Sequence, residues 1–275
     1  MRQTLVVVSD LHCGSTVGLC CPEEVRWDDG GYYHPSEAQL WLWENWLDFW
    51  RQAEAIRGDS DWFGVLVNGD AVDGDHHGTP QIISRDLQVQ FWILKKVFAP
   101  VLALQPDTVT VVRGTETHVG KGGSTEEAFA RWLKDQVHVP ASDAEMYSHW
   151  YFRGMIGDCR IDATHHGRIG QRPWTKANAV LNLAAQIFYE YAAAGESHPH
   201  LAFRSHFHTF QDSHDAHPVR VIQTPAWQLS TAYAYRVVPE SLADIGGIIL
   251  TVEDGEYAIQ KILYRPKRAS IVRLA

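Results

Sequence analysis

The chain has 275 residues, of which 45% are hydrophobic and 21% charged, and its formal net charge is −9. This length suits one large α/β domain, and we expect a single domain over residues 1–275. The acidic balance does not fit a protein that coats duplex DNA through a broad basic face. No run of about 20 apolar residues, no signal peptide and no disulfide framework is indicated, so we expect a cytoplasmic protein without membrane contact.

Short apolar runs rich in β-branched residues recur along the chain as far as residue 204. Each run ends in polar residues, which is the pattern of a buried parallel strand that feeds a loop. The predicted strands cover residues 5–9, 63–68, 108–113, 159–164 and 201–204.

Helical patterns separate these predicted strands. Ser36 and Gln39 have the spacing of a capping box, which predicts a helix that continues to about Arg57. Its buried face is predicted from the apolar spacing at Leu40, Trp43, Leu47 and Trp50. Further helices are expected over residues 86–99, 124–136 and 174–194, the second of them capped by Ser124 with Glu127.

The pattern changes after Val219, where antiparallel strands are expected over residues 247–253 and 256–264. Asp254 and Gly255 join these two strands and form a strong hairpin signal. Strands that alternate with helices, followed by a hairpin, predict two packed β-sheets flanked by helices.

Side chains that can bind metal ions follow each of the five predicted strands that end by residue 204. They are Asp10, His12, Asp70, Glu116, His118, His165, His166, His206 and His208. Because open α/β sheets place their binding sites at the carboxyl ends of the strands, we expect these side chains to lie together. Imidazole and carboxylate groups bind Zn²⁺, Mn²⁺ and iron, and one tetrahedral ion uses only four ligands. The sequence therefore predicts two metal ions.

The order of these residues resembles a known family signature. D-x-H, G-D-x-x-D, G-N-H-[DE], H and G-H-x-H mark the calcineurin-like metallophosphoesterases, and the chain is similar at residues 10–12, 69–73, 114–118, 165 and 206–208. Its Trp-rich segments and the insert after the first motif also resemble phage or prophage members. The resemblance implies a four-layer α/β/β/α fold.

The resemblance also implies a ligand set. Asp10, His12 and His208 would bind one ion, His165 and His206 the other, and Asp70 would bridge them. His166 is the alternative to His165. Asp73 is similar to the family's second acid in its motif, with a loop-capping role as the alternative. The expected ions are Mn²⁺, with Mg²⁺, Fe, Ni²⁺ or Zn²⁺ as alternatives.

Two positions depart from the family pattern. Ser205 replaces the glycine of G-H-x-H, a change between small residues that we expect to cost little. Gly114-Thr115-Glu116-Thr117-His118 replaces G-N-H, and there we predict Glu116 as a metal ligand and His118 as the acid that protonates the leaving group. The added charge of a glutamate would favour a hard cation such as Mn²⁺ over Zn²⁺. Thr115 could instead occupy the position of the family's asparagine.

Further residues near the motifs could contact substrate. Arg113, His76 and His77 are placed to meet a phosphate, and residues 14–34 form a Gly-rich insert that could act as a lid. The expected function is the hydrolysis of phosphate mono- or diesters, with a nucleotide or nucleic acid as a candidate substrate. The alternative is a scaffold or regulatory module that keeps the fold without the chemistry. The sequence does not indicate an oligomeric state.

Overall fold

The computed structural model describes the chain except for residues 28, 77, 171, 173–174, 269–270 and 274–275. Its larger sheet has the strand order β13-β12-β1-β4-β5-β6. The strands are β1 (Arg2–Val8), β4 (Trp62–Asn68), β5 (Thr108–Val112), β6 (Ser148–His149), β12 (Ile245–Glu253) and β13 (Glu256–Tyr264). β1, β4, β5 and β6 run parallel, whereas β12 is antiparallel to both β1 and β13. The predicted hairpin is therefore confirmed as one edge of this sheet.

The second sheet has the strand order β10-β11-β9-β8-β7. Its strands are β7 (Phe152–Ile156), β8 (Cys159–His166), β9 (Leu201–Ser205), β10 (Gln211–Asp212) and β11 (Arg220–Gln223). β8, β9 and β11 are parallel, and the two edge strands are antiparallel to their neighbours. The five predicted strands that precede candidate ligands are thus divided between the two sheets.

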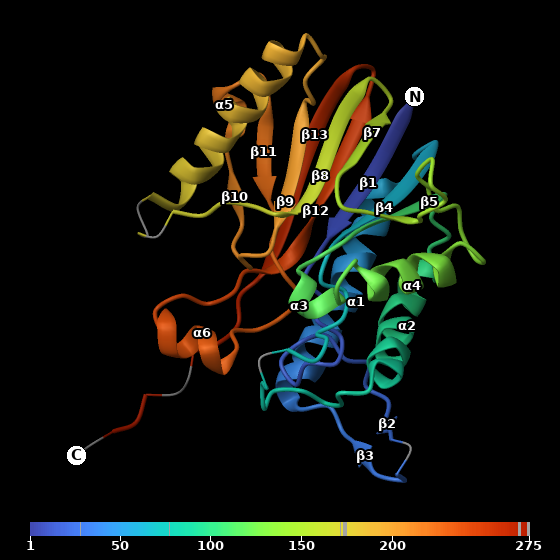
Figure 1. Ribbon diagram of the computed structural model, residues 1–275, viewed down its shortest axis with the longest axis vertical. Coiled ribbons are helices and arrows are strands. Elements are labelled where there is room, and N and C mark those ends of the chain that lie inside the picture. The colour runs from blue at the N-terminus through green and yellow to red at the C-terminus, as the bar shows by residue number, and fades with distance from the viewer. Residues whose placement is uncertain (28, 77, 171, 173–174, 269–270, 274–275) are drawn as a thin grey trace.

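Helices cover the outer faces of both sheets (Figure 1). The long helices are α1 (Glu37–Arg57), α2 (Leu87–Ala103), α4 (Ser124–Leu133) and α5 (Lys176–Ala194). The short elements are the hairpin β2 (Val25–Arg26) and β3 (Tyr32–Tyr33), α3 (Glu116–Val119), η2 (His214–Ala216) and α6 (Ala232–Val237). Within the described residues, no helix combines the length and apolar character that crossing a membrane requires.

Alternate residues of β1 show why these layers form. Val6 and Val8 pack in the core that the larger sheet shares with α1, α2 and α4, whereas Leu5 and Val7 face the second sheet. A third core lies between α5 and the outer face of the second sheet. Both faces of β1 are buried, which explains why the strand reads as a continuous apolar run. The four-layer α/β/β/α arrangement is confirmed.

Two details of the helix predictions are wrong. Of the face predicted for α1 only Trp50 is buried, and Leu40 is 38% exposed. The other buried apolar residues of the helix are Leu42, Trp46, Phe49 and Ala53. The helix carries apolar side chains on more than one face, so spacing alone could not select the buried one. At the start of α4 the cap is Gly123 in a left-handed conformation, without a side-chain hydrogen bond. The Glu127 carboxylate instead accepts hydrogen bonds from Tyr147 and Ser148. The capping box of α1 at Ser36 and Gln39 is confirmed.

The segment 14–34, for which a lid was expected, contributes to the core beside α1. Leu19, Cys20 and Val25 are buried there. The Gln39 side-chain amide donates hydrogen bonds to the carbonyl oxygens of Ser15 and Gly18, at 3.0 and 3.4 Å. These contacts anchor the segment at its first half, and the β2-β3 hairpin forms its outer part (Figure 1).

Candidate metal centre

The loops that follow β1 and β4 are joined by backbone hydrogen bonds. Asp10 N donates to Gly69 O at 2.9 Å, and His12 N donates to Asp70 O at 3.0 Å. β8 and β9 end beside them, because the Asn68 amide donates to Thr164 O and to Ser205 Oγ across the two sheets. Four segments distant in sequence thus present their side chains to one site.

The structure brings six predicted ligands together in two groups. Asp10, His12 and His208 form one group, and Asp70, His165 and His206 form the other. In each group the donor atoms all lie within 4.8 Å of one another. His165 Nε2 lies 3.0 Å from Asp70 Oδ2 and 3.8 Å from Asp10 Oδ1, so the two groups adjoin.

Several donor atoms at this meeting point are buried without hydrogen-bond partners. They include Asp10 Oδ1, His12 Nε2 and His165 Nε2. Buried polar atoms in native proteins are almost always satisfied, and leaving one unpaired costs about 1–3 kcal/mol. Three such atoms that converge from separate loops fit a site that holds divalent cations.

Hydrogen bonds fix the rings so that these nitrogens point inward. His165 Nδ1 donates to Asn68 O at 2.7 Å, and His12 Nδ1 lies 3.1 Å from Asp73 Oδ1. A carbonyl oxygen can only accept, so the proton of neutral His165 is on Nδ1 and its Nε2 lone pair is available. Such outer contacts orient histidine ligands in metal sites.

Backbone strain is concentrated at the same residues. Five of the nine non-glycine residues with positive φ in the described chain are candidate ligands. They are Asp10 (52°), His12 (46°), Asp70 (52°), His206 (78°) and His208 (50°). Each costs about 1–2 kcal/mol relative to ordinary backbone, and such strain is characteristic of functional sites.

Close packing between the loops explains two glycines of the motifs. At Gly69, which has a φ of 89°, a Cβ would lie 2.4 Å from His165 Nδ1. At Gly114 a Cβ would lie 2.0 Å from Asp70 Oδ1. A side chain at either position would displace a candidate ligand.

In the metal-free site, the buried carboxylates strongly favour a positive charge beside them. Burial opposes ionisation of Asp10, but His165 and His208 outweigh it and lower the pKa of Asp10 to about 2. Burial likewise disfavours charged His165, but Asp70 and Asp10 outweigh it and raise the pKa of His165 to about 10. A proton on His165 therefore balances the buried carboxylates, a role that a divalent cation could take over.

Thr115, and not Glu116, contacts the candidate ligands. Thr115 N donates to Asp70 Oδ1 at 2.7 Å, and Thr115 Oγ1 lies 3.3 Å from Asp70 Oδ2 and 3.1 Å from His206 Nδ1. The Thr115 hydroxyl, which donates a hydrogen bond to the Asp70 carboxylate, can accept one from Nδ1–H of His206. This leaves the lone pair of His206 Nε2 free. Glu116 is exposed at the first position of α3, and within the described residues it belongs to neither group.

His118 lies next to His12 of the first group. Its Nδ1 donates to Asp73 O at 2.6 Å, and its ring centroid is 4.6 Å from that of His12. His12, Asp73 and His118 form a third metal-capable group, which shares His12 with the first. Burial, and then the charge of His12, lower the pKa of His118 to about 4.

The other predicted residues have different surroundings. Arg113 is buried, and its guanidinium donates to Ser148 Oγ and Gly122 O and lies 3.6 Å from a Glu127 oxygen, so its donors point into the protein. His166 is exposed, whereas His165 beside it is buried. His76 Nε2 lies 3.5 Å from Asp73 Oδ2, and its ring centroid is 4.3 Å from that of His118. His77 lies outside the described residues.

A buried hydroxyl network below the ligands was not anticipated from the sequence. Ser9 Oγ donates to Asp10 Oδ2 at 2.6 Å and lies 2.8 Å from Thr224 Oγ1. Thr224 Oγ1 in turn lies 2.8 Å from Ser205 Oγ. Ser205, which stands where the signature described above has a glycine, is therefore part of the support for Asp10. The one feature of the sequence that could have indicated this network is the position of Ser9 directly before the D-x-H motif.

Glu126 is a second residue that sequence reasoning missed. Its side chain is buried, and Oε1 accepts a hydrogen bond from Ala71 N at 3.3 Å, next to Asp70. In the metal-free protein, burial and the Asp70 charge raise the pKa of Glu126 to about 8, which favours the neutral form at pH 7. A neutral carboxyl can support this loop without adding a further buried charge.

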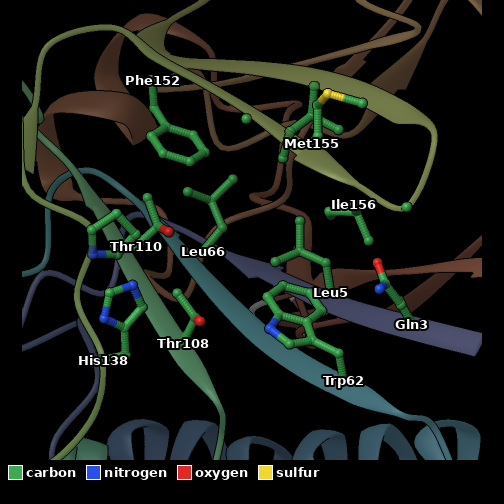
Figure 2. Close-up of a pocket in the computed structure, with 14 residues that line it drawn as sticks. Gln3, Leu5, Trp62, Leu66, Thr108, Thr110, His138, Phe152, Met155 and Ile156 are labelled. Carbon is green, nitrogen blue, oxygen red and sulfur yellow. The ribbon is translucent and has the colours of Figure 1, made fainter.

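A cavity of about 480 Å³ lies at the opposite ends of these strands, between the two sheets. Figure 2 shows Leu5, Trp62, Phe152 and Ile156 around it, with His138 at one side. Its lining within the described residues contains one titratable side chain, His138, and no acid. Within the described residues, this cavity therefore lacks the carboxylates that the candidate metal centre contains.

No model of a known protein family matches the chain, and no curated protein matches it. Several solved structures do. Vacuolar protein sorting 29 from Cryptosporidium parvum is 10% identical with a TM-score of 0.42, and the match covers 97% of this chain and 100% of that one. The phosphoesterase YfcE from E. coli is 11% identical with a TM-score of 0.40, over 94% and 98% of the two chains. A dimetal phosphatase from Danio rerio is 11% identical with a TM-score of 0.44, over 94% and 95%. At these identities and TM-scores, function has to be inferred from the residues of the site.

Proposed function

We propose that this protein is a hydrolase of phosphate esters that depends on two divalent metal ions. The observation that carries the proposal is the pair of adjoining Asp/His groups, in which three buried donor atoms converge without hydrogen-bond partners. Mixed oxygen and imidazole donors suit Mn²⁺, Fe and Zn²⁺. When bound, two such ions lower the pKa of a water, orient a phosphoryl group and neutralise its charge.

Each candidate ligand has a proposed place. Asp10, His12 and His208 would hold one ion, and His165 and His206 the other. Asp70 would bridge them, because its Oδ2 lies 3.0 Å from His165 Nε2 and 4.0 Å from His12 Nε2. Thr115 would hold Asp70 and His206 in place. We keep Mn²⁺ as the proposed ion. The argument that favoured Mn²⁺ over Zn²⁺ depended on Glu116, which lies outside both groups.

His118 is the proposed donor of a proton to the leaving alkoxide. Its Nδ1 is held by Asp73 O, so the exchangeable proton is on Nε2. In the metal-free protein its lowered pKa keeps most of this side chain neutral at pH 7. The negative charge of a bound phosphate ester favours the protonated form, which raises the pKa toward the working range.

The rival proposal is a scaffold that kept the fold and lost the chemistry. Strained backbone at five candidate ligands argues against it, because each such residue reduces stability without benefit unless the site is used. The altered motif at residues 114–118, which suggested this rival, still supplies contacts to Asp70 and His206 through Thr115.

Metal content provides the direct test of the proposal. We expect metal-stripped protein, reconstituted with Mn²⁺ and desalted, to hold two ions per chain by elemental analysis. The same protein is expected to hydrolyse bis(p-nitrophenyl) phosphate only when reloaded. A saturating content of one ion per chain contradicts the dinuclear site, and two bound ions without hydrolysis of any mono- or diester favour the scaffold.

Thr115→Val is expected to weaken the binding of one of the two Mn²⁺ ions by about 10-fold. Valine keeps the shape of threonine but removes the hydroxyl that contacts Asp70 and His206, and loss of such orienting contacts typically costs 10-fold to 100-fold in metal affinity. Calorimetric titration of Mn²⁺ into metal-free protein measures the effect. Glu116→Gln, one residue away but exposed, is the matched control and should bind both ions as the unaltered protein does. Weakened Mn²⁺ binding in Glu116→Gln, with unchanged binding in Thr115→Val, would instead indicate that Glu116 is the ligand.

A further inference from the structure

A groove of about 680 Å³ lies beside the candidate metal centre. Its lining includes Asp73 and His76, Pro80 and Gln81, and Tyr233 and Arg236 of α6. Ala232 N donates to Gln81 Oε1 at 2.6 Å, so a hydrogen bond joins α6 to the segment that contains Gln81. In Figure 1, α6 stands apart from the two sheets.

His76 connects the groove to His118. The His76 ring centroid is 4.3 Å from that of His118, the proposed proton donor, and His118 is held by the backbone of Asp73. A proton donor must reach the leaving oxygen in the transition state. A leaving group that His118 protonates would therefore lie next to the part of the groove that His76 lines.

The groove is much larger than a phosphate group and lies in the range of pockets for organic ligands. Tyr233 is 67% exposed, and the Arg236 guanidinium lies 5.8 Å from the centre of its ring. Within the described residues, Arg236 makes no hydrogen bond or ion pair. An exposed aromatic ring beside an arginine that has no ion-pair partner among the described residues, in a chain of net charge −9, offers a stacking surface together with a local anion site.

We propose that this groove binds the nucleoside leaving group of a phosphodiester. Tyr233 stacks on the base, and Arg236 pairs with a further phosphate on the same nucleoside. The inference rests on the proposed function, which it narrows to phosphodiesters of nucleotides.

Binding to metal-free protein tests the groove apart from catalysis. The probe is dithymidine monophosphate, and the readout is its dissociation constant from nuclear magnetic resonance titration. We expect Tyr233→Ala to weaken binding by about 10-fold, since stacking on an aromatic side chain contributes roughly 5-fold to 150-fold. Tyr233→Phe should retain the affinity. Tyr235→Ala is the matched control, because Tyr235 is 47% exposed on the same helix but does not line the groove.

The arginine is tested with a dinucleotide that carries an additional terminal phosphate on the leaving nucleoside. Arg236→Ala should remove the gain in affinity that this phosphate gives to the unaltered protein, and Arg236→Lys should recover part of it. If the unaltered protein does not bind either dinucleotide, or if Tyr233→Ala and Tyr235→Ala bind dithymidine monophosphate equally, the groove proposal is overturned.

Kinetics of the Mn²⁺-loaded protein separate the two proposals. We expect dithymidine monophosphate to have a KM about 10-fold below that of the methyl ester of thymidine monophosphate, and Tyr233→Ala to raise the KM for the dinucleotide with little change in kcat. Hydrolysis of bis(p-nitrophenyl) phosphate without this KM difference contradicts the groove and leaves the proposed function standing. If no ester is hydrolysed, the proposed function fails, and the binding experiment still decides the groove.

Discussion

Asp70→Asn is expected to lower kcat/KM for bis(p-nitrophenyl) phosphate by roughly 10³ or more. Asp70 is the only carboxylate in the second group, and its Oδ2 lies within 4.0 Å of His12 Nε2 in the first. Asparagine keeps the shape and the hydrogen bond from Thr115 N but loses the charge that two cations would share. Loss of one electrostatic contact to a transition state costs about 10² to 10³, and a residue that holds both ions should cost at least that much.

The same variant should also lose metal. We expect elemental analysis of reconstituted Asp70→Asn to find one ion per chain or none, with the far-ultraviolet circular dichroism unchanged. Glu116→Gln removes a carboxylate of similar charge from the loop beside Asp70 and should retain both metal content and activity. Full metal content with full activity in Asp70→Asn would contradict the bridging role.

His118→Ala is expected to lower kcat about 10²-fold for esters with alkyl leaving groups, and far less for nitrophenyl esters. Nitrophenolate departs without protonation, whereas an alkoxide needs the proton that His118 Nε2 would supply. Comparison of the methyl and nitrophenyl esters of thymidine monophosphate measures the difference. Metal content should be unchanged, because His118 belongs to neither of the two groups that bind the ions in our proposal.

The role of His118 as proton donor can also be tested through the pH dependence of hydrolysis. A general acid must be protonated, so hydrolysis of the alkyl ester should fall as pH rises through the pKa that His118 has with substrate bound. This limb should be absent for nitrophenyl esters and absent in His118→Ala. His166→Ala, which removes an exposed histidine beside the site, is the control and should keep the limb. Equal losses on both substrates, or loss of an ion, would show that His118 is a ligand or a structural residue.

The sequence was sufficient to predict the layers and the six Asp and His residues of the two groups. β1 could be predicted because its apolar run reflects burial on both faces, and the hairpin because Asp254-Gly255 has a local conformational preference. Asp10 and Asp70, and likewise His165 and His206, could be placed together because parallel strands of one sheet bring their carboxyl ends to one edge, and in the structure the two edges adjoin. The phage-type resemblance and the cytoplasmic location stay predictions.

Only the tertiary structure decided which neighbour in a motif makes the contact. Thr115 reaches Asp70 and His206, which lie 45 and 91 positions away, whereas Glu116 points to solvent. The two residues are adjacent, so this choice depends on how the end of β5 is oriented against the other loops. The tertiary structure likewise decided that His165, and not its neighbour His166, lies with the candidate ligands.

Supporting residues depended on the fold in the same way. Glu126 contacts Ala71 from a helix 55 positions along the chain, and the groove joins residues 78–81 to α6, about 150 positions apart. Helical spacing offered several faces for α1, and packing against the larger sheet selected the one with Trp46 and Phe49. Periodicity and motif order therefore determined the elements and the metal-binding side chains of this protein. The burial of one residue rather than its neighbour was decided by contacts between distant segments, which no local pattern contains.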